Sequence, residues 1–321
     1  MSIFNNLFTP LNIAVVLLIA ISIAFIIRLI KKKKKLSIYF HGHVNHDILD
    51  LIIKKYNHIN ISGEQRILTV MFIDIKGFTA LSENLSNKKI VELLNTYFSD
   101  ISKIIFTHYG TVDKYIGDTV MAFWGAPLLD RYQASNALKA AIEIQNYFQQ
   151  KGRGIRIGIN TGPVLVGNIG NPNMMSYTAI GDSVNVASRL ESLCKQYGVN
   201  ILFSKSTKEK LQSEVKSIDK EVFWREIDKV RVYGRREVTY IYELIGSKER
   251  ILPREISGYE YFEDGLICYR NGNWEKAESL FRRASRRLNK DKASKTFIKR
   301  CKKFQISPPK GKWNGTLTLL K

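Results

Sequence analysis

The chain has 321 residues, of which 45% are apolar and 25% charged, so it can bury one main core with smaller attached parts and is not a disordered chain. Its net charge of +21 suits nucleic acid, an anionic membrane or a polyphosphate ligand, and only the position of the charges can decide among them. Three cysteines without a CxxC pair argue against a disulfide framework or a zinc site and indicate reduced thiols in the cytosol.

An apolar segment near the N-terminus is long enough to cross a membrane. Leu11–Ile30 has about the 20 residues that a bilayer core requires, and five lysines, Lys31–Lys35, follow it. A signal peptide carries its positive charge before the apolar run, so this order indicates a single-pass anchor in the inner or plasma membrane with the rest of the chain in the cytoplasm. We expect residues 1–35 to form the anchor and residues 36–63 a linker with a short amphipathic helix.

The first strand of the main domain is predicted over Arg66–Ile73, an apolar run typical of a buried strand. It ends at Asp74, and Gly77 then lies in a turn that leads into a helix. A carboxylate beside free backbone N–H groups can bind a metal ion and a phosphate together. This turn is therefore a candidate binding element.

A second acid lies at a predicted hairpin tip. Val112–Ile116 and Thr119–Trp124 are strand-like and flank Gly117-Asp118, which is a strong hairpin signal. The second arm is apolar enough for a central strand, although a Gly-Asp tip alone is usually structural. Two acids at adjacent strand ends, Asp74 and Asp118, can share a metal pair, as phosphoryl transfer on a nucleoside triphosphate requires.

Two amphipathic helices and two strands around a glycine turn are predicted in the middle of the chain. The helices are the segment from Ser86 or Asn87 to about His108 and Tyr132–Lys151; the strands are Arg156–Asn160 and Val164–Ile169, around Thr161–Pro163. Further on, Asn185 and Arg189 are four residues apart and lie on one helix face. An amide beside a guanidinium suits a sugar hydroxyl and a phosphate, but the pair alone would be an exposed polar stripe.

Four segments together resemble the class III nucleotidyl cyclase domain in order, spacing and residue type. They are FIDIKGFTALSE, DKYIGDTVMAFWG, IGINTGPVLVGNIG and YTAIGDSVNVASRLE, and the resemblance runs from about Arg66 to Leu244. It implies an α+β, ferredoxin-like catalytic domain over residues 64–246. It also implies an enzyme that converts a nucleoside triphosphate to a cyclic nucleotide and pyrophosphate.

The resemblance assigns a role to each candidate site residue. Asp74, Ile75 and Asp118 would bind two Mg²⁺ or Mn²⁺ ions per site. Asn185 would orient the ribose, and Arg189 would stabilise the negative charge that grows on the α-phosphate. The β- and γ-phosphates would lie on the backbone of Ile75, Gly77, Phe78 and Thr79.

Two positions are expected to read the base. Lys114 occupies the purine-contacting position of the family, and Thr178 the position where many adenylate cyclases have Asp. A lysine donates to adenine N1 and a threonine hydroxyl can accept from the N6 amino group, so both suit ATP. Guanylate-specific members typically carry Glu and then Cys or Ser, so a guanylate cyclase is the alternative that these residues disfavour.

One motif departs from the family pattern. The usual VKGK is replaced by Val232–Arg235, in which Tyr233 stands where a lysine would bind the triphosphate. Tyrosine cannot neutralise a phosphate, so Arg235, Arg231 or Arg236 would have to substitute, and we assign Arg235. This departure motivates a third hypothesis, a catalytically weak regulatory protein whose cyclase fold serves for dimerisation.

The family resemblance also implies a partner. In this family the metal-binding acids of one chain face the base-reading and Asn/Arg residues of another, so a head-to-tail homodimer would form two complete sites. ATP is the expected substrate. The membrane anchor would confine both copies to one plane and so raise their effective concentration.

Residues 247–321 are predicted to form a tetratricopeptide-like helical extension with a turn at Asn271–Asn273 and a third helix over Phe297–Phe304. Residues 251–321 hold 17 Lys and Arg against 7 Asp and Glu, a charge of +10. The extension serves either for packing or for docking a protein partner or an acidic surface. Nucleic acid is not expected, because no binding motif accompanies the charge.

Overall fold

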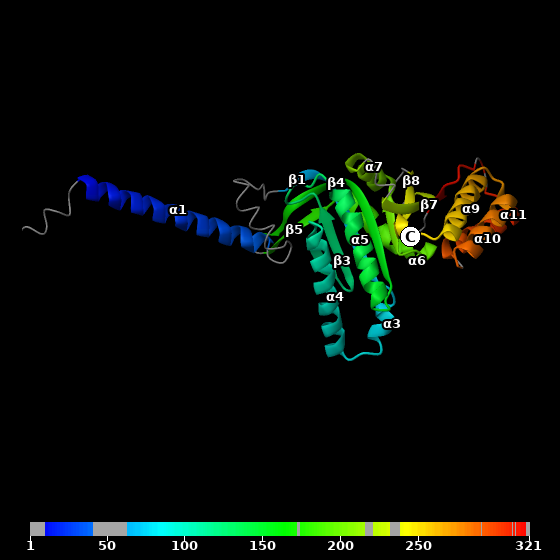
Figure 1. The fold of residues 1–321 in the computed structure, drawn as a ribbon, viewed down its shortest axis with the longest axis horizontal. Helices are drawn as coiled ribbons and strands as arrows, with labels where there is room; N and C mark the ends of the chain where they lie inside the picture. The colour runs from blue at the N-terminus through cyan, green and yellow to red at the C-terminus, as the bar shows by residue number, and fades with distance from the viewer. Residues whose placement is uncertain are drawn as a thin grey trace, which may run out of the picture.

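The computed structural model describes residues 10–40, 63–171, 174–215, 221–231, 238–289, 291–309, 311 and 313–318, and one mixed sheet organises most of them (Figure 1). The strand order is β2-β3-β1-β4-β6-β8-β7-β9, and β5 also pairs with β4. The strands are β1 (Glu64–Ile75), β2 (Thr111–Ile116), β3 (Thr119–Trp124), β4 (Ile155–Asn171), β5 (Met174–Ile180), β6 (Ile201–Ser204), β7 (Val222–Arg231), β8 (Val238–Ser247) and β9 (Leu317–Thr318).

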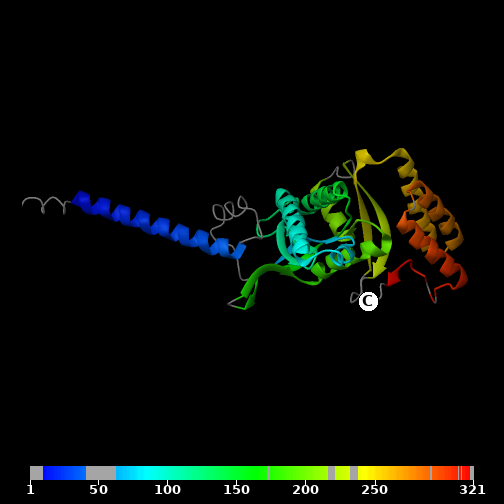
Figure 2. The ribbon, with the colours of Figure 1, turned by 90° about the horizontal axis from the view of Figure 1, so that it is seen from below.

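Helices cover the sheet on both sides, so its central strands are buried (Figures 1 and 2). On one face, α4 (Asn87–Thr107), α5 (Gln133–Gln150) and α7 (Lys205–Glu214) share an apolar cluster with β1 and β3. On the other face, β5 and α6 (Asp182–Tyr197) pack against the opposite side chains of the same two strands. The predicted helices are confirmed, and Ser86 is the N-cap of α4.

The predicted Asp118 hairpin is confirmed. Strands β2 and β3 pair antiparallel around Gly117, whose φ of +63° is the left-handed conformation that glycine adopts without cost. Strand β3 also pairs with β1, and its residues from Val120 to Trp124 are buried. The tip that carries Asp118 is therefore built on a strand held from both sides.

The predicted turn at Thr161–Pro163 is wrong. The segment is the middle of one continuous strand, β4, which pairs with β1 from Ile155 to Val166. The glycines serve close packing instead of a turn: a Cβ on Gly158 would lie 2.2 Å from the Ala187 carbonyl oxygen, and one on Gly162 would lie 2.4 Å from Ser183 Oγ. Both neighbours belong to α6, so the glycines let this helix approach the strand.

The predicted C-terminal helices are present as α9 (Pro253–Arg270), α10 (Trp274–Arg287) and α11 (Lys292–Ile306). A Cβ on Gly265 would lie 2.8 Å from the Phe281 ring, which explains the small residue at this helix crossing. The three helices and α6 share one apolar cluster, to which α6 contributes Tyr197 and α11 contributes Phe297. The extension and the cyclase-like domain are thus joined by a common core.

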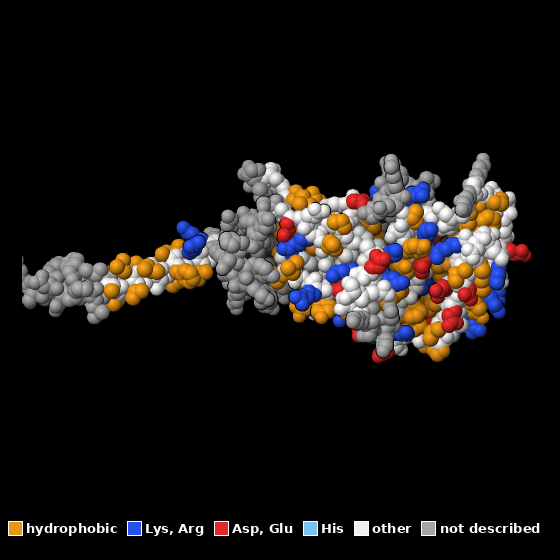
Figure 3. Space-filling view, turned by 90° about the horizontal axis from the view of Figure 1, so that it is seen from above, with side chains coloured by type: hydrophobic (Ala, Val, Ile, Leu, Met, Phe, Trp, Pro, Cys, Tyr) orange, Lys and Arg blue, Asp and Glu red, His pale blue; other side chains and the backbone are white. Residues whose placement is uncertain are grey.

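Helix α1 (Pro10–Phe40) projects away from the sheet, and hydrophobic side chains surround its described part before the first basic residues (Figure 3). Residues Ala14–Lys31 have a mean hydropathy of 2.5, and none of them is buried. The helix is long and apolar enough to cross a membrane. It continues past the predicted end of the anchor to Phe40, and the rest of the predicted linker helix, residues 41–62, lies outside the described residues.

Candidate active site

Two carboxylates meet at one end of the sheet. Asp74 lies in β1 one residue beyond Ile73, which pairs with Val120 of β3, and Asp118 lies at the tip from which β3 begins. The pKa of Asp118 is raised first by burial and then by the negative charge and hydrogen bonding of Asp74. A raised pKa of this origin is expected where two acids share one site.

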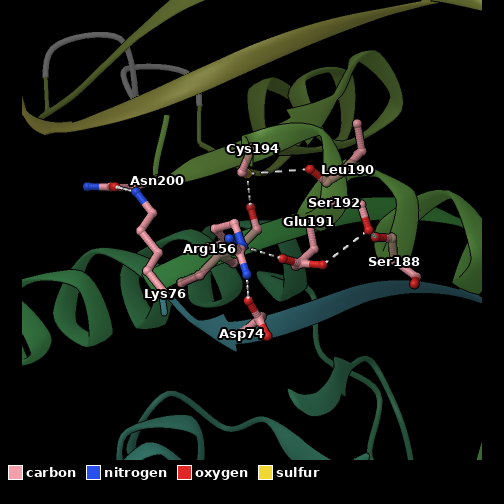
Figure 4. A network of polar contacts seen from close by, with 10 residues as sticks. Asp74, Lys76, Arg156, Ser188, Leu190, Glu191, Ser192, Cys194 and Asn200 are labelled. Atoms are coloured by element: carbon pink, nitrogen blue, oxygen red, sulfur yellow. Dashed lines mark hydrogen bonds and ion pairs between the residues drawn. The ribbon is translucent and has the colours of Figure 1, made fainter. Parts of the chain in front are cut away.

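An arginine that the sequence reasoning missed, Arg156, lies beside Asp74 (Figure 4). Arg156 of β4 stands directly opposite Asp74, and its Nη2 donates to Asp74 Oδ2. Its Nε donates to Glu191 Oε1 of α6 over 2.9 Å. Burial, followed by the charge of Asp74, raises the pKa of the Glu191 carboxyl. One guanidinium therefore lies between two carboxylates from different elements.

A signal for Arg156 exists in the sequence. In a strand, alternate side chains point to opposite faces, and Ile155, Ile157 and Ile159 are all buried on the α4–α5 face. Arg156 therefore points to the α6 face, between two isoleucines of a strand that is covered on both sides. A cation at such a position requires acidic partners, which would have marked it as a site candidate.

The turn after Asp74 is open on one side. Gly77 has φ +72°, and a Cβ on it would meet nothing within 4 Å. Lys76 N donates to the Gly154 carbonyl over 2.9 Å, and buried Phe78 begins the short helix α3 (Phe78–Ser82). Ile75, Gly77 and Thr79 thus lie on a turn that is held at both ends, as a backbone binding element requires.

The predicted catalytic pair lies on α6. Asn185 is exposed and Arg189 is half-buried, one helical turn apart on the same side of the helix. Gly181, whose φ is +145°, is the N-cap of α6, and the helix packs on β4 at Gly158. This packing fixes where the helix lies relative to the strand that carries Arg156.

The predicted base-reading residues are brought together by a third side chain. Thr178 Oγ1 donates to Asp113 Oδ2 over 2.7 Å, and the Ala179 backbone N–H donates to the same oxygen over 3.1 Å. Lys114 Nζ lies 3.3 Å from the other oxygen, Oδ1. Sequence reasoning missed Asp113, which sits between the two predicted readers.

A β-bulge explains this arrangement. Val112 pairs with Ala122 and Lys114 pairs with Met121, so Asp113 is an extra residue in β2. In a regular strand Asp113 and Lys114 would point to opposite faces, whereas a bulge sets both opposite one partner residue. The bulge therefore directs the carboxylate and the ammonium to the same neighbourhood as Thr178.

The structure groups the predicted residues into two sets. Asp74 accepts a hydrogen bond from Arg156, and Thr178 donates one to Asp113. Within the described ranges, no three His, Cys, Asp or Glu side chains gather as a complete metal cage. A cation at Asp74 and Asp118 would draw further ligands from backbone, water and substrate phosphate, as Mg²⁺ commonly does. Tyr233 and Arg235 lie outside the described residues.

A mixed sheet with paired acids at a strand end and a polar helix across it defines an α+β domain of the nucleotidyl cyclase class. The family described as the adenylate and guanylate cyclase catalytic domain matches residues 62–245. The chain therefore belongs to this family, as its sequence motifs predicted. Family membership implies a nucleotide substrate and the use of a divalent metal ion.

Individual relatives include enzymes for both bases. A Dictyostelium discoideum adenylate cyclase, specific to terminal differentiation, is 36% identical over 246 residues, which is 73% of this chain but 11% of that protein. The adenylyl cyclase CyaB from P. aeruginosa has a TM-score of 0.51 and 34% identity, over 59% of this chain and 99% of that one. For the guanylyl cyclase Cya2 these values are 0.50, 32%, 59% and 96%. Overall similarity to these relatives therefore does not distinguish ATP from GTP as the substrate.

Proposed function

We propose that the chain is an adenylate cyclase that converts ATP to 3′,5′-cyclic AMP and pyrophosphate at a homodimer interface. The observation that carries this proposal is the meeting of Asp74 and Asp118 at one end of the sheet, with the pKa of Asp118 raised by burial and by its neighbour. The preference for ATP over GTP is supported by Lys114 and Thr178, which both flank Asp113.

The acids fit a divalent cation, because burial and mutual repulsion disfavour leaving both of them charged without one. Asp74, Asp118 and the Ile75 backbone would hold two Mg²⁺ or Mn²⁺ ions. Bound metal would lower the pKa of the ribose 3′-hydroxyl and neutralise triphosphate charge. Arg156, already at Asp74, adds a guanidinium that can pair with phosphate oxygens.

Other residues of the protein perform the remaining roles in the proposed reaction. Asn185 orients the ribose, and Arg189 stabilises the charge that develops on the α-phosphate as pyrophosphate leaves. The backbone of the open turn around Gly77 and Thr79 holds the β- and γ-phosphates. Arg235 replaces the usual lysine at the triphosphate.

Two copies are needed for a complete site. Asp74 is bonded to Arg156, whereas Thr178 and Lys114 gather around Asp113, and these separate contacts support the assignment of two half-sites to one chain. A head-to-tail dimer related by a two-fold axis would bring each half-site against its complement and form two sites. Helix α1 would anchor both copies in the inner or plasma membrane, with the catalytic domain on the cytoplasmic side.

The test uses the full chain in membranes, incubated with ATP or GTP and Mn²⁺, with the cyclic product identified by chromatography. Cyclic AMP from ATP, formed much faster than cyclic GMP from GTP, is the expected result. A preference for GTP would establish the guanylate alternative. No product from either nucleotide, with dimers verified, would establish the catalytically weak alternative.

The C-terminal helices supply a second surface, which we assign to an acidic segment of a partner protein. A groove of about 450 Å³ between α10 and α11 is lined by Arg282, Ser285, Arg286, Lys295, Ile298, Lys299 and Lys302. Helices α10 and α11 lie at the end of the molecule opposite α1, so the groove between them is distant from a membrane that α1 spans (Figure 1). The basic side chains complement an acidic ligand, and the distance from the membrane favours a soluble acidic partner over anionic lipid.

A poly-glutamate peptide and vesicles of phosphatidylserine and phosphatidylcholine serve as probes for this groove. We expect the chain to bind the peptide. The affinity should fall at least about tenfold in R286E/K299E but not in the control R254E/K248E. The control makes the same change in net charge at two residues outside the groove. Equal binding by both variants, or dependence of vesicle binding alone on the groove residues, would contradict the assignment.

A further inference from the structure

Asp113 is a buried acid that contacts the residues proposed to read the base. It is 2% exposed, although a charged carboxylate is costly to bury without partners. Its partners are two donors on β5, the Thr178 hydroxyl and the Ala179 N–H, and the ammonium of Lys114. Two of these three are the residues proposed to read the base.

The carboxylate determines which hydrogen-bonding role Thr178 can play toward a ligand. An ionised carboxylate only accepts hydrogen bonds, so the Thr178 hydroxyl must donate its single proton to Oδ2. The Ala179 N–H, bonded to the same oxygen, holds Oδ2 in place. With its proton committed, Thr178 Oγ1 can act only as an acceptor toward a third group.

The other oxygen acts on Lys114. The bulge in β2 places the two residues side by side, and Nζ lies 3.3 Å from Oδ1, so the two charges attract each other, although Oδ1 accepts no hydrogen bond from the described residues. Lysine offers donors and no acceptor. Around Asp113 the protein therefore presents one fixed acceptor, Thr178 Oγ1, and one donor, the Lys114 ammonium, that the carboxylate attracts.

We propose that Asp113 is a positioning residue that sets the preference for adenine by fixing Thr178 as an acceptor and Lys114 as a donor. This inference rests on the proposed function, in which these two side chains contact the base. Adenine presents an acceptor at N1 and a donor at N6 and matches the pair. A 6-oxopurine such as hypoxanthine or guanine presents a donor at N1 and an acceptor at O6 and mismatches both.

The experiment measures competition between ATP and inosine triphosphate for cyclisation by the full chain. The ratio of the two specificity constants does not depend on how much of a variant is folded. D113V removes the acceptor and frees the Thr178 hydroxyl, so the preference for ATP should fall at least about tenfold. D113N should lower the preference less than D113V does, because the Ala179 N–H orients the amide oxygen to the Oδ2 position, where it still accepts from Thr178, whereas the amide NH2 at the Oδ1 position no longer attracts Lys114.

A double-mutant cycle separates this role from a merely structural one. T178V removes the hydroxyl, so adding D113V to T178V should change the ratio much less than it does in wild type. An unchanged ratio in D113V, or the same change with and without the hydroxyl, would overturn the inference.

Failure of the proposed function would look different. A wild-type chain that cyclises neither nucleotide would contradict the adenylate cyclase assignment. The Asp113 inference would then be decided by the same variants in a binding assay, in which ATP and inosine triphosphate displace a fluorescent ATP analogue. A wild-type chain that binds both equally would overturn the inference as well.

Discussion

Asp74 has a cation for a neighbour before any metal binds. The Arg156 guanidinium is shared between Asp74 and Glu191, and the third carboxylate, Asp118, has its pKa raised by burial and by Asp74. The site therefore holds more negative charge than this one guanidinium neutralises. A divalent ion at Asp74 and Asp118 would relieve this repulsion as well as act on the substrate.

Removing either acid should abolish cyclisation and leave the fold intact. D74A and D118A are each expected to lower the rate of cyclic AMP formation at least about 100-fold at saturating Mn²⁺, because each removes a ligand of the proposed metal pair. Thermal unfolding should show no loss of stability in D118A, since this change also removes like-charge repulsion. Substantial activity in either variant would contradict the metal assignment.

At the scale of elements, the contact between β4 and α6 positions the site. A Cβ on Gly158 would lie 2.2 Å from both the Ala187 carbonyl and the Glu191 N–H, which are backbone atoms that cannot turn aside. Because α6 also carries Asn185 and Arg189, any shift of this helix would move the proposed catalytic pair.

G158A should therefore lose stability and activity together. We expect the free energy of unfolding to fall by about 3 kcal/mol, and cyclic AMP formation to fall with it. The matched control is G154A, where the three atoms nearest to the added Cβ belong to the Lys76 side chain and not to the backbone, so a loss below about 1 kcal/mol is expected. The free energy of unfolding of both variants is measured by urea denaturation. Equal stability of G158A and G154A would show that α6 adapts to the extra methyl group.

The C-terminal helices are joined to α6 by a buried polar cluster as well as by apolar packing. Arg300 of α11 donates to Asp228 Oδ2 over 2.6 Å, and the Tyr197 hydroxyl of α6 donates to the same oxygen over 2.5 Å. The Asp228 side chain is 1% exposed, so its charge depends on these partners. Helix α11 thus contacts the far end of the helix that carries Asn185 and Arg189.

R300M should destabilise the chain by about 3–5 kcal/mol, since it leaves a buried carboxylate without its cation. R282M, in which an exposed ion pair to Glu278 within α10 is lost, should cost less than about 1 kcal/mol. Both are measured by urea denaturation. A similar loss in the two variants would mean that the Tyr197 hydroxyl and the Lys229 N–H satisfy the Asp228 carboxylate without Arg300.

At the scale of the whole molecule, the two half-sites predict complementation. An inactive D74A chain mixed with an inactive R189A chain should regain activity, because a mixed dimer collects both lesions in one site and leaves the other intact. Activity should approach half the wild-type value per heterodimer. Co-expressed chains with different affinity tags provide verified mixed dimers, and no recovery in them would mean that each chain builds its site alone.

Local signals in the sequence predicted much of this protein correctly. Gly117-Asp118 between two strand-like runs predicted the hairpin, the apolar run before Lys31–Lys35 predicted α1, and the helical spacing of apolar residues predicted α4, α5 and the C-terminal helices. These features depend on neighbours in the chain, so residue type and spacing are enough to specify them. The four motifs likewise identified the family, which the match over residues 62–245 confirms.

Only the tertiary structure decided what depends on contacts between distant segments. The glycines of β4 led to the prediction of a turn, because glycine is common both in turns and at close packing contacts. Only the approach of α6 to Gly158 distinguishes the two. The Arg156 ion pairs require the register of β4 against β1, and the orientation of Asp113 requires a bulge in the pairing of β2 with β3. Register and bulges are properties of paired strands, so neither strand alone contains them.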